Sequence, residues 1–457
     1  MKKILLTLAA VILTIPYFCA AEEKKSGDFV TLTDVPSTLV YPSFWHTPFG
    51  VHRGTPFWLK VFLGNKTYFS DPQDTACTKM LADYGGINPG KDDWQLSAFG
   101  VNSGRGEIIY NVSMSGLAVF GNSGAGEGEF NRPTGISCNE YGDVYVADTG
   151  NNRIVRLYYK DGKLRFIRNI GKAGSGDGEF NRPLYVEMDS SGKLYVSDNG
   201  NNRIQVFSKS GGFLYSIDQT KGISNPRGIC VVDENQRYLG YKQNCIYVID
   251  GYFNRLQKFD LNGNIVRGVR VDEKLGRKVV LTTLDYDYYG NLYLVDYFNS
   301  QVHKFSPDLA YITSYGSYGT DDYKFEKPTG ISIYRHYGQV IVSDKESAQY
   351  FWIGSDVTNF RVARIQAVPP VNALQFDFFL TEKSFVTMEI ELDKDKKITV
   401  CKNIQLEQGE NSISWEIPPE YVPLILPGQK YTTNVRVMAT YSSYPHIEKV
   451  AKAEFVY

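Results

Sequence analysis

Residues 144–154 read Val-Tyr-Val-Ala-Asp-Thr-Gly-Asn-Asn-Arg-Ile, and residues 194–204 read Leu-Tyr-Val-Ser-Asp-Asn-Gly-Asn-Asn-Arg-Ile. In both stretches a tyrosine lies three residues before an aspartate, and an apolar residue follows that aspartate by nine. Similar marks surround six aspartates, which are Asp71, Asp148, Asp198, Asp250, Asp296 and Asp344. A period of about 50 residues indicates a supersecondary unit that must stack on its neighbours to bury its faces.

Each copy divides into four short strands. In the second copy, β-branched and aromatic runs separated by Gly, Asn and Asp cover residues 135–138, 144–148, 153–159 and 164–170. Four-stranded antiparallel units repeated around an axis form a propeller, and six units suit a closed ring. The sequence therefore predicts an all-β chain with a six-bladed β-propeller at residues 55–358.

The first copy is longer than the others. Proline marks the start of a strand, and the prolines that open the copies are Pro56, Pro133, Pro183, Pro226 and Pro328. Because 77 residues separate the first two aspartates, we expect an insertion at residues 82–107. Trp94 lies in this glycine-rich and acidic segment, whose composition fits a binding loop and a plain disordered insertion equally well.

The best-kept copies carry a family signature. Gly-Glu-Phe-Asn-Arg-Pro-Thr-Gly-Ile at 128–136, with residues 144–154 after it, closely resembles the NHL repeat, and residues 178–183 with 194–204 resemble it again. The resemblance covers residues 55–353. It departs in copies five, six and one, where Gln301, Gln349 and Ala76 replace the arginine. It implies a six-bladed propeller of a family that mostly binds protein or RNA, with one zinc-dependent relative, the peptidyl-hydroxyglycine amidating lyase.

The amino-terminal region precedes the repeat. Residues 1–21 combine two lysines, an uncharged apolar run and small residues before a cut near Ala21, which is typical of a secretory signal. We therefore expect an exported chain that is periplasmic, attached to the cell surface or secreted, with no membrane span. Residues 22–54 form an arm, and we expect its segment at 29–32 to complete the last blade and close the ring.

The carboxy-terminal region lacks the 50-residue period. Residues 365–457 alternate between apolar and polar side chains in the manner of a β-sandwich. Residues 409–415, followed by 426–431, are similar to the immunoglobulin-like modules of flagellar hook-capping proteins. The resemblance implies an Ig-like β-sandwich that anchors or presents the propeller.

Five cysteines remain once the signal is removed, and their spacing matches no zinc pattern. Cys230 and Cys245 are expected on the first two strands of blade four, on either side of an enlarged turn. Because export permits disulfides, we predict a bond between Cys230 and Cys245. In the alternative interpretation, both are small buried apolar side chains.

Metal chemistry finds little support in the sequence. No two of the five histidines occupy equivalent blade positions: His46, His52, His303, His336 and His446. A zinc lyase needs about three histidines that converge on one ion. We predict no metal site and no cofactor. A structural calcium ion held by carbonyl groups of the channel is the alternative that the sequence leaves open.

Arginine and asparagine gather on one predicted face. The loop entering the first strand and the loop joining the second and third strands emerge on the same side of a blade. Their polar residues are Arg132, Asn152, Arg153, Arg182, Asn202, Arg203, Arg227, Asn254, Arg255 and Lys327. Arginine recognises carboxylates and is enriched in binding hot spots, so this face fits an acidic protein or polysaccharide partner. Alternatively, the same residues cap turns and pair between neighbouring blades.

Two functions from different classes fit these patterns. The favoured one is an exported, non-enzymatic propeller that serves as a protein- or glycan-binding scaffold. The other is a propeller enzyme, a metal-dependent lyase, lactonase or hydrolase, with its site in the central channel. A net charge of −1 argues against nucleic acid as the partner, because such binding depends on phosphate neutralisation.

Overall fold

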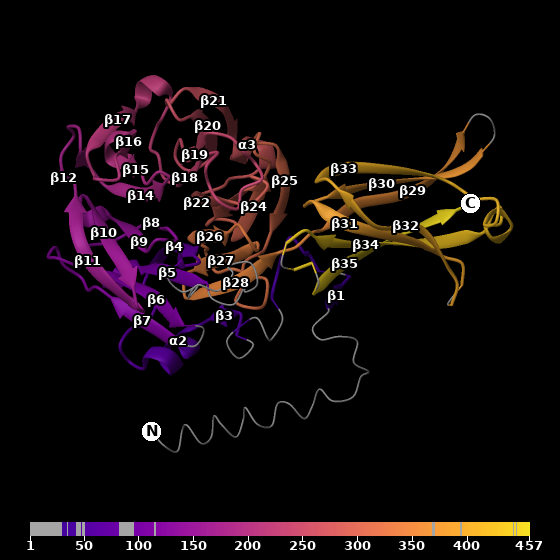
Figure 1. Cartoon of the computed structure of the whole chain (residues 1–457), viewed down its shortest axis with the longest axis horizontal. Coiled ribbons are helices and arrows are strands. Elements are labelled where there is room, and N and C mark those ends of the chain that lie inside the picture. The colour runs from indigo at the N-terminus through magenta and orange to yellow at the C-terminus, as the bar shows by residue number, and fades with distance from the viewer. Residues whose placement is uncertain are drawn as a thin grey trace, which may run out of the picture.

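The computed structural model describes residues 30–33, 35–42, 47, 51–81, 96–113, 116–367, 371–393, 395–441, 443–444 and 446–457. The predicted signal and Trp94 lie outside these residues. Figure 1 shows a ring of small sheets at one end of the molecule and an elongated pair of sheets at the other. Within the described ranges, no helix has the length and apolar character needed to cross a bilayer.

Six small antiparallel sheets form the ring, as the repeat predicts. Each inner strand comes first in its blade, and the remaining strands follow outward. Blades 1 and 2 contain β4 (Pro72–Thr78), β5 (Ser97–Asn102), β6 (Glu107–Ser113), β7 (Gly116–Phe120), β8 (Ile136–Cys138), β9 (Asp143–Asp148), β10 (Arg153–Lys160) and β11 (Lys163–Ile170). Blades 3 and 4 contain β14 (Pro183–Met188), β15 (Leu194–Asp198), β16 (Arg203–Phe207), β17 (Phe213–Ile217), β18 (Ile229–Val232), β19 (Cys245–Asp250), β20 (Arg255–Asp260) and β21 (Ile265–Arg270). Blades 5 and 6 contain β22 (Leu281–Tyr286), β23 (Leu292–Asp296), β24 (Gln301–Phe305), β25 (Tyr311–Tyr315), β26 (Gly330–Tyr334), β27 (Gln339–Asp344) and β28 (Ser347–Ile353).

The repeated aspartate organises the turn between the second and third strands. Asp148 is fully buried, and its Oδ1 accepts a hydrogen bond from the Asn131 backbone N–H at 2.7 Å. Its Oδ2 accepts from Asn151 Nδ2 and Arg153 Nε, both at 2.8 Å. Asp198 makes the corresponding three contacts in blade 3. Each aspartate therefore ties its own turn to the loop that enters the blade.

Blade 2 has its strands within one residue of the predicted bounds, but blade 1 differs from the prediction. Pro56 begins helix α2 (Pro56–Leu63), and Asp71 precedes the innermost strand. Strand β5 lies inside the range expected to be an insertion. Asn102 holds the position of the turn aspartate, because its Oδ1 accepts from the Ser70 backbone N–H at 2.7 Å. The first copy was therefore aligned on Asp71, whereas the residue equivalent to the other turn aspartates is Asn102.

The amino-terminal arm completes the last blade. Strands β2 (Leu39–Val40) and β3 (Arg53–Gly54) both pair antiparallel with β28. The prediction that residues 29–32 fill this place is wrong, because β1 (Val30–Leu32) pairs in parallel with β35 (Ile447–Val456). Leu39 is fully buried whereas Val30 is 44% exposed. The segment at 39–40 therefore closes the ring, because its apolar side chains are removed from water there.

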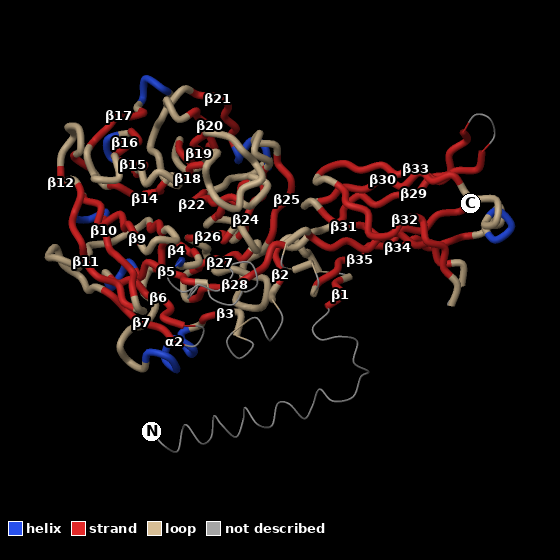
Figure 2. Tube along the Cα trace, viewed as in Figure 1, coloured by secondary structure: helices blue, strands red, loops and turns tan. Residues whose placement is uncertain are grey.

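The second domain is a sandwich of two sheets, which extends to the right of the ring in Figure 2. It begins at Val357, before the predicted boundary at residue 365. Alternate apolar side chains from both sheets, including Phe376, Phe378 and Met388, form its core. The strands besides β1 and β35 are β29 (Val357–Ala367), β30 (Val371–Leu380), β31 (Ser384–Glu391), β32 (Lys397–Leu406), β33 (Gly409–Glu416) and β34 (Lys430–Ala439). An immunoglobulin-like relationship stays a prediction.

Buried polar contacts join the two domains. Lys304 on β24 forms an ion pair with Glu382 of the sandwich and donates to the Thr381 carbonyl at 2.8 Å. The Tyr289 hydroxyl lies 2.6 Å from Thr440 Oγ1. Lys304 is 1% exposed and Glu382 is fully buried. The sandwich is therefore attached to blade 5 by groups that would be costly to leave unpaired.

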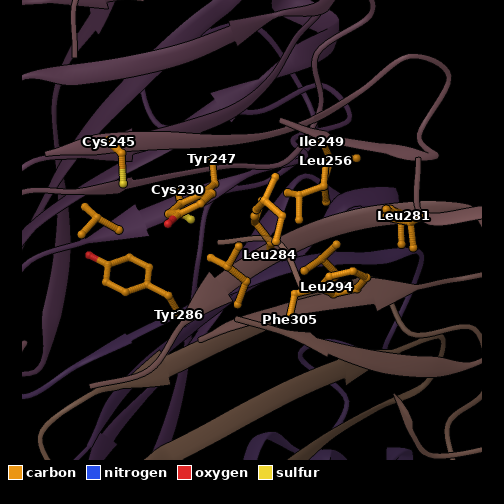
Figure 3. Close-up of a cluster of buried hydrophobic side chains, with 14 of the residues drawn as sticks. Cys230, Cys245, Tyr247, Ile249, Leu256, Leu281, Leu284, Tyr286, Leu294 and Phe305 are labelled. Carbon is orange, nitrogen blue, oxygen red and sulfur yellow. The ribbon is translucent and has the colours of Figure 1, made fainter. Parts of the chain in front are cut away.

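The predicted disulfide is not formed in this structure, because Cys230 and Cys245 are both free thiols. The register pairs Cys230 with Tyr247 and Cys245 with Val232, so the two cysteines are diagonal rather than opposite. Figure 3 shows both within the apolar cluster between blades 4 and 5, beside Tyr247 and Tyr286. They occupy the positions of small buried apolar side chains.

Candidate binding face

One face of the ring carries the turns between second and third strands together with the loops that enter the inner strands. We call it the turn face. The residue before the opening proline lies there in five blades, with φ between 48° and 55°, at Asp71, Arg132, Arg182, Asn225 and Lys327. All except Asn225 are exposed. At this position the side chain is therefore cationic in blades 2, 3 and 6 and anionic in blade 1.

Arg153 and Arg203 do not point into solvent on this face. Besides its turn aspartate, Arg153 donates to the carbonyls of Ala125 at 2.8 Å, Gly126 at 3.0 Å and Glu129 at 2.9 Å. Arg203 does the same with two carbonyls of the loop before blade 3. Both are 9% exposed. Their donors are consumed inside the protein, so they clamp each turn to the preceding loop.

Arg255 of blade 4 is a more open version of the same clamp. Its Nε and Nη2 both donate to the buried carboxylate of Asp250 at 2.7 Å, and Nη2 also donates to the Gly222 carbonyl at 2.9 Å. The hydrogen bonds from Asp250 raise the pKa of Arg255 above its ordinary value. Its side chain is 32% exposed, so part of the guanidinium remains accessible to a partner.

The predicted asparagines connect neighbouring blades. Asn152 Oδ1 accepts from the backbone N–H of Arg182 at 2.8 Å, and Asn202 Oδ1 accepts from that of Asn225 at 2.9 Å. Asn254 Nδ2 donates to Asp272 at 2.9 Å. Each asparagine side chain therefore fixes a loop instead of facing a partner.

A cluster of aromatic residues on the turn face was not predicted. The turns of blades 4 and 5 read Gly-Tyr-Phe-Asn (251–254) and Tyr-Phe-Asn-Ser (297–300), where blade 2 has Thr-Gly-Asn-Asn. Tyr252 is 78% exposed and Phe298 is 56% exposed. The signal in the sequence was the pair of aromatic residues at a position where turns are normally polar.

Cations lie over these rings. Arg227 is 4.9 Å from the centre of the Phe253 ring, and Lys278 is 4.9 Å from that of Phe298. Lys327 lies 5.5 Å from the Tyr297 ring. We call these seven residues, Tyr252, Phe253, Tyr297, Phe298, Arg227, Lys278 and Lys327, the aromatic patch. Arg227 and Lys327 thus lie beside aromatic rings, a setting that the sequence did not reveal.

The backbone beneath the patch is strained. Tyr252 and Phe253 both adopt left-handed conformations, with φ of 65° and 70°. Such a conformation is uncommon for bulky residues, costs about 1–3 kcal/mol each and is concentrated at functional sites. Phe253 is half-buried against the apolar cluster between blades 4 and 5, whereas Tyr252 is held outward, which is consistent with a binding surface.

The channel holds a small, closed cluster of charges. Arg335 Nη2 lies 3.2 Å from Asp285 Oδ1, and Asp285 Oδ2 accepts from the Ile333 backbone N–H at 2.7 Å. Burial raises the pKa of Glu187 to about 8, and the Asp285 carboxylate adds to that rise. Both acids line a cavity of about 70 Å³ formed by the inner strands.

The enlarged turn of blade 4 crosses the far end of the channel. Tyr238 stacks on His336 of blade 6 with ring centres 3.9 Å apart, and Arg237 forms an ion pair with Glu140 of blade 2 at 3.0 Å. Blades 2, 4 and 6 are thereby connected around the axis.

The described histidines lie in separate surroundings. His303 is fully buried, and its ring nitrogens contact Asp296 Oδ2 at 3.1 Å and Ser314 Oγ at 2.8 Å. It thus takes the role that Gln257 plays toward Asp250 in blade 4. His52 stacks on Tyr41, and His46 lies outside the described residues. Across the described ranges, no three His, Cys, Asp or Glu side chains are arranged to hold a metal ion.

Comparison with known proteins finds similarity in the repeat region. Residues 130–157 and 180–207 match the model of the NHL repeat. The chain is 35% identical over 163 residues to the B-box type zinc finger protein ncl-1 of Caenorhabditis elegans, which covers 36% of this chain and 17% of that protein. It is 26% identical over 162 residues to Protein brain tumor of Drosophila melanogaster, covering 35% of this chain and 14% of that protein. The chain thus spans less than a fifth of the length of either relative.

Solved structures with similar folds are more distant in sequence. Virginiamycin B lyase from Staphylococcus aureus is 14% identical, with a TM-score of 0.40, and the match covers 58% of this chain and 82% of the lyase. The calcium-binding protein regucalcin from Agrobacterium tumefaciens is 13% identical, with a TM-score of 0.42, over 63% of this chain and 91% of that one.

Proposed function

We propose that this chain is an exported binding protein whose propeller holds an acidic segment of a protein partner on the turn face. The aromatic patch carries the proposal. Tyrosine, tryptophan and arginine dominate interface hot spots, and Tyr252 and Phe298 are exposed where most turns of the ring are polar. The matches to the NHL repeat and to ncl-1 support a binding propeller.

Charge on the turn face favours an acidic partner. The turn carboxylates Asp250 and Asp296 are fully buried, and they are paired with Arg255 and His303. Lys278 and Lys327 of the patch lie over its rings, and the nearby acids Asp272 and Glu273 are both paired with Arg270. Such a face attracts carboxylates, and exposed pairs of this kind weaken as salt increases.

The enzyme hypothesis receives less support from the channel. Ligand pockets for molecules of drug size have volumes of about 300–1,000 Å³, whereas the channel cavity is about 70 Å³. Its acids are enclosed by the six inner strands, and the turn of blade 4 crosses one end. A site for a small ion or water fits this space better than a site for an organic substrate.

Replacement of the patch aromatics tests the proposal. The mature chain is used to capture a partner from the envelope fraction, and the Kd of the purified partner is then measured. We expect Tyr252→Ser with Phe298→Ser to weaken binding at least tenfold, because each truncation of a hot spot costs about 2 kcal/mol or more. Tyr141→Ser is the matched control, since Tyr141 is 61% exposed on the opposite face.

Three outcomes would contradict the proposal. One is equal binding by the double variant and the wild type. Another is equal loss in the Tyr141→Ser control. The third is a partner that resists protease but is destroyed by glycosidases, which would identify a polysaccharide. Export is tested separately by fractionation and by sequencing the amino terminus of the mature protein, for which we expect a start just after Ala21.

A further inference from the structure

Five of the six contacts between blades are filled by apolar side chains from both partners. Separate buried clusters occupy the contacts of blades 1 with 2, 2 with 3, 3 with 4, 4 with 5 and 5 with 6. For the described residues, the contact of blade 6 with blade 1 has no such cluster. It holds instead a cavity of about 300 Å³, which we call the seam pocket.

The seam pocket results from small residues on one side of β5. Phe99 and Val101 are buried against blade 2, whereas Ala98 and Gly100 alternate with them and face blade 6. Blade 6 also presents a small side chain here, at Ala348. Two facing surfaces of small residues cannot fill the space that bulky residues fill at the other contacts.

Helix α2 forms a further wall of the pocket. Its residues Trp58, Leu59 and Phe62 line the cavity, and Ile109 and Ile341 line it from the two blades. Leu59 is 3% exposed, which shows that this side of the helix faces the interior. The helix that follows the arm therefore encloses an apolar space, and Val51, His52 and Gly54 of the arm line it as well.

Two of the polar side chains in the wall, Asn111 and Gln349, are already hydrogen-bonded within the protein. Asn111 accepts from the Ala98 backbone N–H at 2.6 Å and donates to the Leu96 carbonyl at 2.7 Å. Gln349 accepts from the Tyr41 hydroxyl at 2.6 Å and donates to the Lys324 carbonyl at 2.8 Å. These groups leave little for a charged ligand to pair with, and an unpaired buried charge is costly.

Asp74 is the acidic residue in the wall, and it also lines the channel cavity. Its Oδ1 has no hydrogen-bond partner among the described residues, and burial raises the pKa of Asp74 well above its ordinary value, which favours the uncharged form. Asp74 Oδ2 accepts from the backbone N–H of Ile136 in blade 2 at 3.1 Å, on the channel side of β4. Apolar cavities of this size can bind small apolar molecules. We propose that the seam pocket is a binding site for a small, uncharged, mostly apolar molecule.

An uncharged dye tests the site in the full chain. We expect Nile red to bind at one saturable site per chain, with increased fluorescence. Gly100→Leu fills the pocket and should weaken binding at least tenfold. A Cβ at Gly100 would lie 3.8 Å from the Ile109 carbonyl oxygen, an ordinary contact, so the substitution is compatible with the fold. Ala98→Leu is a second filling variant with the same expected effect.

Two controls separate the seam pocket from other surfaces. Gly268→Leu adds the same side chain on the exposed outer strand β21, where a Cβ would lie 3.6 Å from Gln257 Cγ, and it should bind the dye normally. The double variant of Tyr252 and Phe298 should also bind normally, because the aromatic patch belongs to blades 4 and 5, whereas the seam pocket lies between blades 6 and 1. Loss of dye binding in that variant would place the site there and overturn the inference.

Photocrosslinking locates the site in the wild-type protein without any substitution. Benzophenone, which is uncharged and apolar, is irradiated with the full chain, and the modified peptides are identified by mass spectrometry. Adducts on α2, β5 or β28 support the seam pocket. The inference is overturned by adducts confined to other elements, by the absence of saturable dye binding, or by unchanged binding in the folded filling variants.

Discussion

Arg53 Nη2, in the amino-terminal arm, lies 3.5 Å from Asp344 Oδ2 in blade 6. This ion pair replaces the one that blades 2, 3 and 4 make within their own turns, because Gln349 stands where those blades have arginine. Arg53 also donates to carbonyls of the preceding loop, at Thr320 and Asp321. The arm thus supplies both a strand and the missing clamp.

Loss of this clamp should weaken ring closure. Arg53→Ala leaves Asp344, which is 1% exposed, without its cation, and breaking one side of a buried pair costs about 3–5 kcal/mol. Urea unfolding measures the change. Arg132→Ala is the control, because an exposed substitution of this kind should stay within about 0.5 kcal/mol. Equal stability of Arg53→Ala and the wild type would mean that the arm closes the ring without the ion pair.

The choice of closing strand makes a second prediction. Leu39→Ala removes a fully buried side chain next to β28 and should lower the free energy of unfolding by about 2–5 kcal/mol. Val30→Ala, at a position 44% exposed in the sandwich, should change it far less. Thermal unfolding of the two variants compares them directly. A larger loss for Val30→Ala would favour the closure by residues 29–32 that the sequence suggested.

The ion pair between the domains makes a third prediction. Lys304→Met alone leaves Glu382 buried without its cation and should cost about 3–5 kcal/mol. Adding Glu382→Leu should recover part of that loss, because it removes one of the two buried carboxylates that Lys304 pairs with. The other, Asp287 Oδ2 at 3.9 Å from Lys304 Nζ, remains in the double variant. A double-mutant cycle on urea unfolding gives the coupling. Additive single effects would show that the two groups do not depend on each other.

Channel acids should make stability depend on pH. The folded-state pKa of Glu187 is about 8, above the ordinary value of 4.5, so the folded protein keeps this proton where the unfolded chain loses it. Stability from this group is therefore fully present below about pH 4.5 and is lost as pH rises through 8. Glu187→Gln should remove this part of the loss. Melting temperatures of the two proteins between pH 5 and 9, a range chosen around these values, provide the check.

The repeat predicted the propeller because the turn chemistry is local. Asp148 contacts residues of its own turn and of the loop directly before it, so the pattern can be read from neighbouring residues. The prediction failed for blade 1, because Asn102 and Glu107 occupy the positions that the aspartate and the arginine hold in the other blades. Residues 29–32 and 39–40 are both short apolar segments, and only tertiary burial distinguishes them.

The candidate face was predicted only in part. The sequence located the turn face, but it could not tell that Arg153 and Arg203 would spend their donors on backbone carbonyls of the preceding loop. Those carbonyls are brought into reach by the stacking of blades. Tyr252 and Phe298 are among the most exposed large apolar side chains. They fall outside the predicted face because that face was defined by arginine, lysine and asparagine at the repeated loop positions.

Arg182 and Arg203 of blade 3 should therefore behave in opposite ways. Arg203→Ala removes a clamp whose aspartate is fully buried, and it should lower the free energy of unfolding by about 3 kcal/mol or more. The affinity of the fraction that remains folded should change little.

Arg182→Ala, at an exposed position on the mouth of the channel, should leave the free energy of unfolding within about 0.5 kcal/mol of the wild type. It should instead reduce the affinity for an acidic partner and make binding less sensitive to salt. Urea unfolding, together with Kd measurements at two salt concentrations, separates these effects. If Arg203→Ala weakens binding while the protein remains equally stable, the clamp is a contact residue and the assignment is wrong.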